Sequence, residues 1–247
     1  PAGGGALIHA IGAPQSLVLT AASYGVPVLA LCFMRPRDRS RDAAPEPASY
    51  VSELLGGWRY ALQRRLVRTA VIFAGIGALA GRSVLETLPV LANGVFDRGP
   101  AGLGLMTAAA GAGAAGAAIF KAMSRAQRPG VFQKHVLVML LLVPLLVAGL
   151  SLVNSFPVAM AVVLMLGGCV TLLAISLQAL VQMAIDDHFR GRVMGLWTTV
   201  SIGSGALGAV IMGMLVDRIG TAPAQATIGL VLAGLGAVMI RRFMSHG

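Results

Sequence analysis

The sequence predicts an all-α fold, a polytopic bundle of transmembrane helices, and three observations support this prediction. Hydrophobic residues make up 57% of the chain and charged residues 11%, whereas a soluble domain is about 25% charged. Several apolar runs exceed about 18 residues, the length at which a helix spans a bilayer. Lys and Arg residues stand between these runs rather than on one basic face, so the net charge of +10 indicates membrane topology and not nucleic-acid binding.

The first elements differ in character. Residues 1–11 look like the end of a Gly-rich span, and residues 14–34 form a full span that ends at an Arg cluster. Because the chain begins with Pro1 rather than Met, we expect it to be cut from a longer protein. Residues 35–67 form a polar, Pro-rich linker. Apolar side chains recur there at helical spacing, which predicts an amphipathic helix on the membrane surface; they are Tyr50, Leu54, Leu55, Trp58, Leu62 and Leu66.

Six further spans give the chain about eight helices; they are residues 68–92, 101–120, 135–153, 157–185, 193–217 and 222–240. The span 193–217 concentrates small residues, which let helix backbones approach closely in lipid. We therefore expect Gly203, Gly205 and Gly208 to face another helix. The span 101–120, itself rich in Gly and Ala, is expected among its neighbours.

The basic residues predict the orientation. If the Arg cluster after residue 34 is cytoplasmic, 16 of the 19 Lys and Arg residues lie on that side, and only Arg98 and Arg218 lie on the other. Positive residues favour the cytoplasmic side of short loops. The C-terminus is therefore expected in the cytoplasm.

An internal repeat predicts the domain organisation. The sequence PAGGGALIHAIGAP at residues 1–14 resembles ALGAVIMGMLVDRIGTAP at residues 206–223, and each precedes an apolar span and a basic cluster. An even number of helices separates the two copies, so the repeat is parallel. We expect two six-helix halves, with residues 1–34 ending the first half, residues 35–67 linking the halves, and residues 68–247 forming the second half.

The chain resembles the major facilitator superfamily in three motifs. The sequence DDHFRGRVMGL at residues 186–196, with Asp186, Arg190, Gly191 and Arg192, resembles the cytoplasmic loop between the tenth and eleventh spans of that family. The run at residues 99–118 resembles its eighth span in the drug and siderophore exporter branch. Pro1, Gly4 and Gly5 resemble the end of the fifth-span antiporter motif, whereas KAMSRAQRPG at residues 121–130 lacks the Asp of the family's loop motif.

The resemblance implies a secondary transporter in the bacterial inner (plasma) membrane, monomeric when full length. Transport would proceed by rocking of two six-helix halves about a central site. The implied partners are a small organic substrate, protons and the lipid bilayer, with no nucleic acid and no cofactor.

Arg82 and Glu86 are the candidate coupling or gating residues. Glu86 is the only acidic residue inside a span, and Arg82 precedes it by one helical turn. A charge in hydrocarbon costs at least about 2.5–3.5 kcal/mol, so both side chains should face the bundle interior or a wet cavity. The pair is either a proton or substrate site, or a self-neutralising pair that closes an outer gate.

Thr171, Gln178 and Gln182 are the candidate cavity-lining residues, because they place polar groups along one side of the span 157–185. The alternative is that they hydrogen-bond neighbouring helices. The sequence has no nucleotide-binding loop, Cys/His metal cluster or nucleophile elbow, which counts against an ATP-driven pump, a metal site and an enzyme. A proton-coupled exporter is the leading interpretation, and an uptake symporter and a non-transporting remnant of a transporter are the alternatives.

Overall fold

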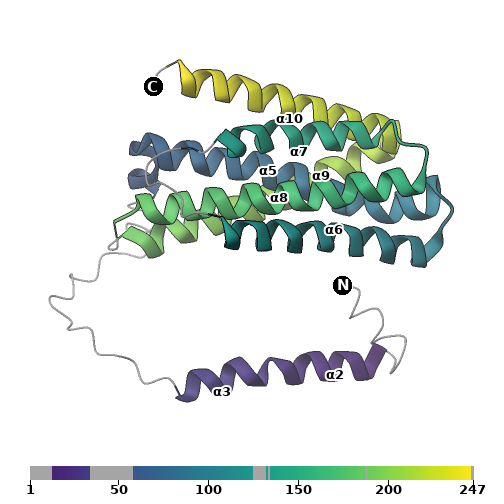
Figure 1. Cartoon of the computed structure of the whole chain (residues 1–247), viewed down its shortest axis with the longest axis horizontal. Helices are drawn as coiled ribbons and strands as arrows, with labels where there is room; N and C mark the ends of the chain where they lie inside the picture. The colour runs from purple at the N-terminus through teal and green to yellow at the C-terminus, as the bar shows by residue number, and fades with distance from the viewer. Residues whose placement is uncertain (1–12, 34–57, 125–131, 133, 187–188, 246–247) are drawn as a thin grey trace. The chain divides into compact units, whose positions relative to one another are not determined.

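The computed structural model describes residues 13–33, 58–124, 132, 134–186 and 189–245, and all secondary structure in this part of the chain is helical (Figure 1). The predicted all-helical membrane bundle is confirmed. The chain forms two units, residues 1–50 and 51–247, which we describe separately. Pro1, Gly4 and Gly5 lie outside the described residues, as do Tyr50, Leu54 and Leu55.

The described part of unit 1, residues 13–33, forms two short helices where the sequence predicted one span over residues 14–34. Helix α2 (Ala13–Ser23) and helix α3 (Gly25–Phe33) meet at Tyr24. The prediction of a continuous helix is wrong here because Pro27 has no N–H group, and its ring clashes with the carbonyl of Ser23 in an uninterrupted helix.

Unit 2 begins, among its described residues, with a short helical stretch at residues 58–63. Six longer α-helices follow: α5 (Arg65–Val90), α6 (Gly99–Met123), α7 (Lys134–Leu150), α8 (Phe156–Ala184), α9 (Arg190–Ile219) and α10 (Thr221–Met244). A π-helical segment, η1 (Leu91–Val95), continues α5. Of these helices, α5 with η1, α6, α8, α9 and α10 are long and apolar enough to cross a membrane. Helix α7 has 17 residues and is about 25 Å long, because a turn begins at Ser151 inside the expected span 135–153.

The packing of unit 2 has an internal symmetry. Helix α5 packs on α9, α6 packs on α8, α7 packs on α10, and α5 and α8 pack on each other. If α5 is exchanged with α8, α6 with α9 and α7 with α10, the same set of packed pairs results. Since α5 and α8 run in opposite directions, the two triplets form an inverted repeat, the arrangement found within halves of major facilitator transporters. Helices α5 and α8 are therefore equivalent central elements.

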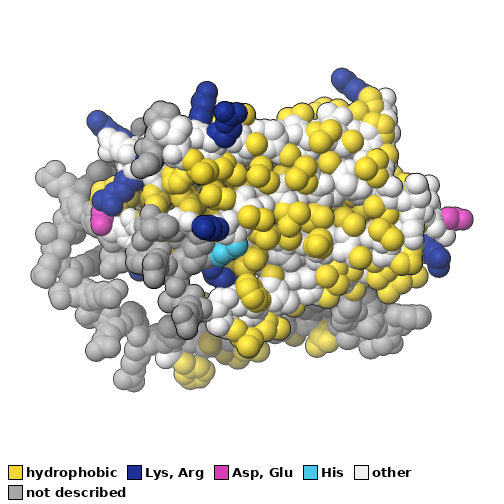
Figure 2. All heavy atoms as spheres, turned by 45° about the horizontal axis from the view of Figure 1, so that its top comes forward, with side chains coloured by type: hydrophobic (Ala, Val, Ile, Leu, Met, Phe, Trp, Pro, Cys, Tyr) yellow, Lys and Arg dark blue, Asp and Glu magenta, His cyan; other side chains and the backbone are white. Residues whose placement is uncertain are grey.

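The surface of unit 2 suits a bilayer. Hydrophobic side chains extend along the face shown in Figure 2, and basic side chains gather mainly toward one end. We call this end the basic end; it holds the starts of α5, α7 and α9 and the ends of α6, α8 and α10 (Figure 1). Large apolar side chains also fill the interior, and those fully buried include Phe73, Leu88, Met106, Leu140, Leu173 and Leu177.

Glycines allow the closest helix contacts. A Cβ atom on Gly208 of α9 would lie 2.5 Å from the carbonyl oxygen of Leu79 in α5, and a Cβ on Gly205 would lie 3.6 Å from the Arg82 side chain. The Ser83 hydroxyl has its shorter hydrogen bond to the Leu79 carbonyl, at 2.6 Å, and shares its proton with the Gly208 carbonyl at 3.3 Å. A Cβ on Gly203, by contrast, would meet no described atom within 4 Å.

The prediction that the span 101–120 would be a neighbour of the glycine face of α9 is wrong. Helix α9 packs on α5, whereas the Gly-rich α6 packs on α8. A Cβ on Gly113 of α6 would lie 3.0 Å from the backbone nitrogen of Gly168, and a Cβ on Gly167 of α8 would lie 3.0 Å from the Cα of Ala110. Each small-residue helix therefore has its own central partner, as the inverted repeat requires.

We predict that Gly208→Leu destabilises the bundle, because any side chain at this position meets the α5 backbone. Overpacking of this kind costs about 1–3 kcal/mol or more. The measurement is the thermal midpoint and the monodisperse yield of the purified protein in detergent. Gly234→Leu in α10 is the matched control, since its Cβ meets no described atom; equal losses in both variants would contradict the prediction.

Candidate functional site

Arg82 and Glu86 form an ion pair on α5. The Nε atom of Arg82 lies 3.1 Å from Oε1 of Glu86, and the two side chains are 56% and 45% exposed in unit 2. Among the described residues, each has the other as its only ion-pair partner. The stem of Arg82 lies over Gly205 of α9, so the close contact of α5 and α9 also positions the pair.

Neighbouring polar side chains on α5 point into the bundle instead. Ser83 donates to the carbonyl of Leu79 at 2.6 Å, and Thr87 donates to the carbonyl of Val84 at 2.8 Å. The amide Nε2 of Gln225, from α10, donates to the Thr87 hydroxyl at 3.1 Å. These groups lie in the interior, where only Oε1 of Gln225 lacks a hydrogen-bond partner among the buried side chains described, whereas the charged pair lies on the open face of α5.

The backbone of α5 changes geometry just beyond the pair. Pro89 lies inside α5 and cannot donate a hydrogen bond to the carbonyl of Leu85. The π-helical segment η1 follows, in which the Phe96 N–H donates to the Leu91 carbonyl at 3.0 Å. Single π turns occur often at functional sites. The sequence analysis missed this segment, for which Pro89 was the available signal.

The three polar residues of α8 lie away from its core side. Leu173, Leu177 and Leu180 are buried, and Gln178, Gln182 and Thr171 lie on the opposite side of the helix. Gln182 is exposed, and the other two are partly buried. Among the described residues, no side-chain hydrogen bond involves these three groups. These side chains therefore do not link α8 to another described helix of unit 2, and they can bind a ligand or a further helix on this face.

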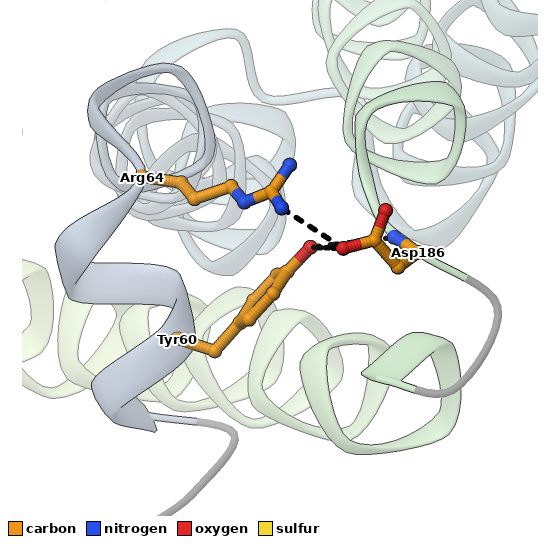
Figure 3. Close-up of polar contacts among 3 residues, drawn as sticks. All are labelled: Tyr60, Arg64 and Asp186. Carbon is orange, nitrogen blue, oxygen red and sulfur yellow. Dashed lines mark hydrogen bonds and ion pairs between the residues drawn. The ribbon is translucent and has the colours of Figure 1, made fainter.

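Asp186 organises a cluster at the basic end (Figure 3). Its Oδ2 atom accepts hydrogen bonds from the Tyr60 hydroxyl and from Nη2 of Arg64, both at 2.9 Å. The Arg64 guanidinium lies 4.7 Å from the centre of the Tyr60 ring, and that ring stacks on Phe189 at 4.4 Å. The end of the linker is therefore attached to the loop between α8 and α9.

The other residues of this loop motif have different contacts. The Nη2 atom of Arg190 lies 3.4 Å from the carbonyl oxygen of Gln182, and the Arg192 guanidinium lies 5.9 Å from the centre of the Phe189 ring. A Cβ on Gly191 would meet no described atom within 4 Å. Sequence analysis missed Tyr60 and Arg64 because more than 120 residues separate them from Asp186. Tyr60 and Arg64 are one helical turn apart in the linker, and this spacing was the sequence signal that the two side chains share one helix face.

The described residues include no cluster of three or more His, Cys, Asp or Glu side chains that would hold a metal ion. Cys32 and Cys169 are free thiols. His135 is a hydrogen-bonding partner of Ser176, with Nε2 and Oγ 3.1 Å apart.

A bundle of long apolar helices whose two triplets form an inverted repeat is the architecture of one half of a major facilitator protein. A family model described as "Transmembrane secretion effector", from the major facilitator superfamily, matches residues 1–245, and the chain belongs to this family. The predicted family is thereby confirmed, and it is a family of transporters rather than enzymes.

Two groups of curated bacterial relatives match nearly the whole chain. The multidrug efflux pump Tap of Mycobacterium tuberculosis (strain ATCC 25618 / H37Rv) is 28% identical over 98% of this chain and 57% of its own length. The enterobactin exporter EntS of Salmonella typhi is 28% identical over 97% of this chain and 58% of its own length. The chain thus spans less than three fifths of these relatives. No solved structure matches the chain.

We predict a small but measurable coupling between Arg64 and Asp186. Their side chains are 48% and 61% exposed, and exposed ion pairs contribute about 0.2–1 kcal/mol in double-mutant cycles. The cycle uses Arg64→Ala, Asp186→Ala and the double variant, with thermal unfolding in detergent as the measurement. A second cycle pairs Arg64→Ala with Asp217→Ala at the opposite end of the unit and should give no coupling. Equal coupling in both cycles would refute the contact.

Proposed function

We propose that this chain forms the C-terminal part of a proton-coupled exporter that moves a small organic compound by alternating access. In this proposal residues 1–34 end the N-terminal half, residues 35–67 link the halves, and residues 68–247 are the second half. The transporter functions as a monomer in the bacterial inner membrane with its C-terminus in the cytoplasm. The names of Tap and EntS, an efflux pump and an exporter, support the direction of transport.

The observation that supports proton coupling is the Arg82–Glu86 pair on the open face of α5. Two charges facing hydrocarbon are unfavourable, so this face is expected to meet water in a central cavity. In this cavity the Glu86 carboxyl group is the one that exchanges a proton with water. Alternating access opens it to one side of the membrane and then to the other.

The open face of α8 supports a substrate site beside this proton site. Helices α5 and α8 are equivalent in the inverted repeat, and the side chains of Thr171, Gln178 and Gln182 on α8 make no hydrogen bond to another described residue. Apolar lining with a few polar groups is typical of small-molecule sites. We assign orientation of the substrate to the glutamine amides and coupling to Glu86, with Arg82 as its electrostatic partner.

Glu86→Gln tests this assignment, because it keeps the shape and hydrogen bonding of the side chain but cannot exchange a proton. In proteoliposomes containing the whole transporter, we measure ethidium transport driven by a pH gradient, and ethidium exchange at equal pH. The driven rate should fall about 5- to 150-fold, the range of typical coupling free energies. The exchange rate should persist, because exchange needs no net proton movement.

Asp217→Asn is the control, an exposed acid at the end of α9 that should leave both rates unchanged. If Glu86→Gln also leaves both rates unchanged at normal expression, Glu86 is only a structural partner of Arg82. Equal losses in the driven and exchange rates would likewise exclude a specific coupling role.

The orientation is tested by reporter fusions. A reporter active only in the cytoplasm should be active when fused after His246 and inactive when inserted within residues 94–99. The expectation follows from the basic end, where Arg241 and Arg242 lie near the C-terminus. An external C-terminus would contradict the proposed topology.

A further inference from the structure

An apolar groove lies in unit 2 between α5, α9 and α10, and its volume is about 410 Å³. This size falls within the range of about 300–1,000 Å³ that is typical of ligand sites. It extends along α5 from Arg68 to Leu79, about 16 Å of helix. The other lining residues are Trp58, Ala61, Leu62, Val71, Ile72, Gly75, Ile76, Leu196, Val200, Ser204, Leu232 and Leu235.

The groove has few polar groups. Arg68 lines it at the basic end, where its Nη1 atom lies 3.4 Å from the carbonyl oxygen of Leu62. Ser204 is the only other lining residue with a hydroxyl or a charge, and no acidic residue is among the lining residues described. Arg59 lines a second hollow beside Trp58. The lining therefore combines a positive mouth with a long apolar interior.

Trp58 places the mouth at the membrane surface. This residue is 48% exposed, and Trp residues are enriched where the bilayer meets water. The α5 residues that line the groove beyond Arg68 are apolar, and they belong to a membrane-crossing helix. A molecule that fills the groove from its mouth therefore passes from the headgroup region into the hydrocarbon region.

We propose that this groove binds one acyl chain of an anionic phospholipid, with Arg68 holding the phosphate-bearing headgroup at the mouth. A polar organic substrate fits poorly, since the interior has almost no groups that would orient it. An acyl chain needs no polar groups to bind in the interior of the groove. Negative lipids are concentrated in the cytoplasmic leaflet, which is where the basic end lies in the proposed topology. The lipid site does not depend on proton coupling.

Bound lipid would join three parts of the protein. Its acyl chain contacts α9 and α10, and its mouth is formed by the start of α5 and the residues 58–62 of the linker. The same linker residues continue to Arg64, which binds Asp186. A lipid in this groove therefore stabilises attachment of the linker end to unit 2.

Trp58 is also the reporter for the test. The chain has two Trp residues, and Trp197→Phe leaves Trp58 alone. The whole protein is placed in phosphatidylcholine vesicles, and part of the lipid is replaced by phosphatidylglycerol or phosphatidylcholine with brominated chains, which quench nearby Trp emission. We expect brominated phosphatidylglycerol to bind about fivefold better than brominated phosphatidylcholine, corresponding to the ~1 kcal/mol contributed by one Arg near an anionic surface.

Two charge variants locate the site. Arg68→Gln should bring the ratio of phosphatidylglycerol binding to phosphatidylcholine binding close to one. Arg241→Gln removes a charge from the same end but outside the groove, and should leave this ratio near five. The unmodified protein gives the same comparison if Trp197→Phe folds poorly, because Trp197 is buried and changes little between lipids.

Three results would overturn the proposal. A ratio of one in the parent protein would mean ordinary boundary lipid. Equal decreases in the Arg68 and Arg241 variants would mean general attraction to the basic end. Absence of quenching by either lipid would mean that part of the chain, such as residues 50–57, fills the groove.

Discussion

The contact of α5 and α9 at Gly208 is the constraint on which the rest of unit 2 depends. Lipid provides no hydrophobic force to join helices, so van der Waals contact between close backbones must do so. A side chain at Gly208 would meet the Leu79 carbonyl, and the Ser83 hydroxyl bonds across the same contact. Gly205, three residues earlier on the same face of α9, leaves space for the Arg82 stem. The charged pair therefore owes its position to a packing requirement of the neighbouring helix.

The inverted repeat extends this principle to the whole unit. Helix α6 meets α8 through Gly113 and Gly167, just as α9 meets α5. Each of the central helices α5 and α8 packs on a Gly-rich helix with one side and on the other central helix with a second side. Each also has a side that no helix of unit 2 covers. On α5 that side holds Arg82 and Glu86; on α8 it holds Gln178 and Gln182. These open sides are where we place proton coupling and substrate recognition.

Sequence reasoning recovered features that depend on composition and local spacing. The long apolar helices of unit 2 were predictable because the bilayer sets their length, and the Arg82–Glu86 pair follows from helical spacing of one turn. Features that depend on which helices meet were not predictable. The partner of α9 was misassigned because Gly and Ala in α6 look equally suitable. Tyr60 and Arg64 were missed because their role depends on contact with Asp186, which is distant in the sequence. Pro27 was overlooked as the cause of the break between α2 and α3.

The central claim is that the part of α5 around Glu86 faces water and not lipid. It is tested most directly by thiol reactivity in membranes, with Cys32→Ser and Cys169→Ala as the background and single cysteines at Leu85 and Val231. These positions are 43% and 63% exposed in unit 2, but only Leu85 adjoins Glu86; Val231 lies on α10. Because the thiolate is the reactive form and needs water, a membrane-impermeant maleimide should label Leu85→Cys at least about tenfold faster. Equal or slower labelling of Leu85→Cys would contradict the account.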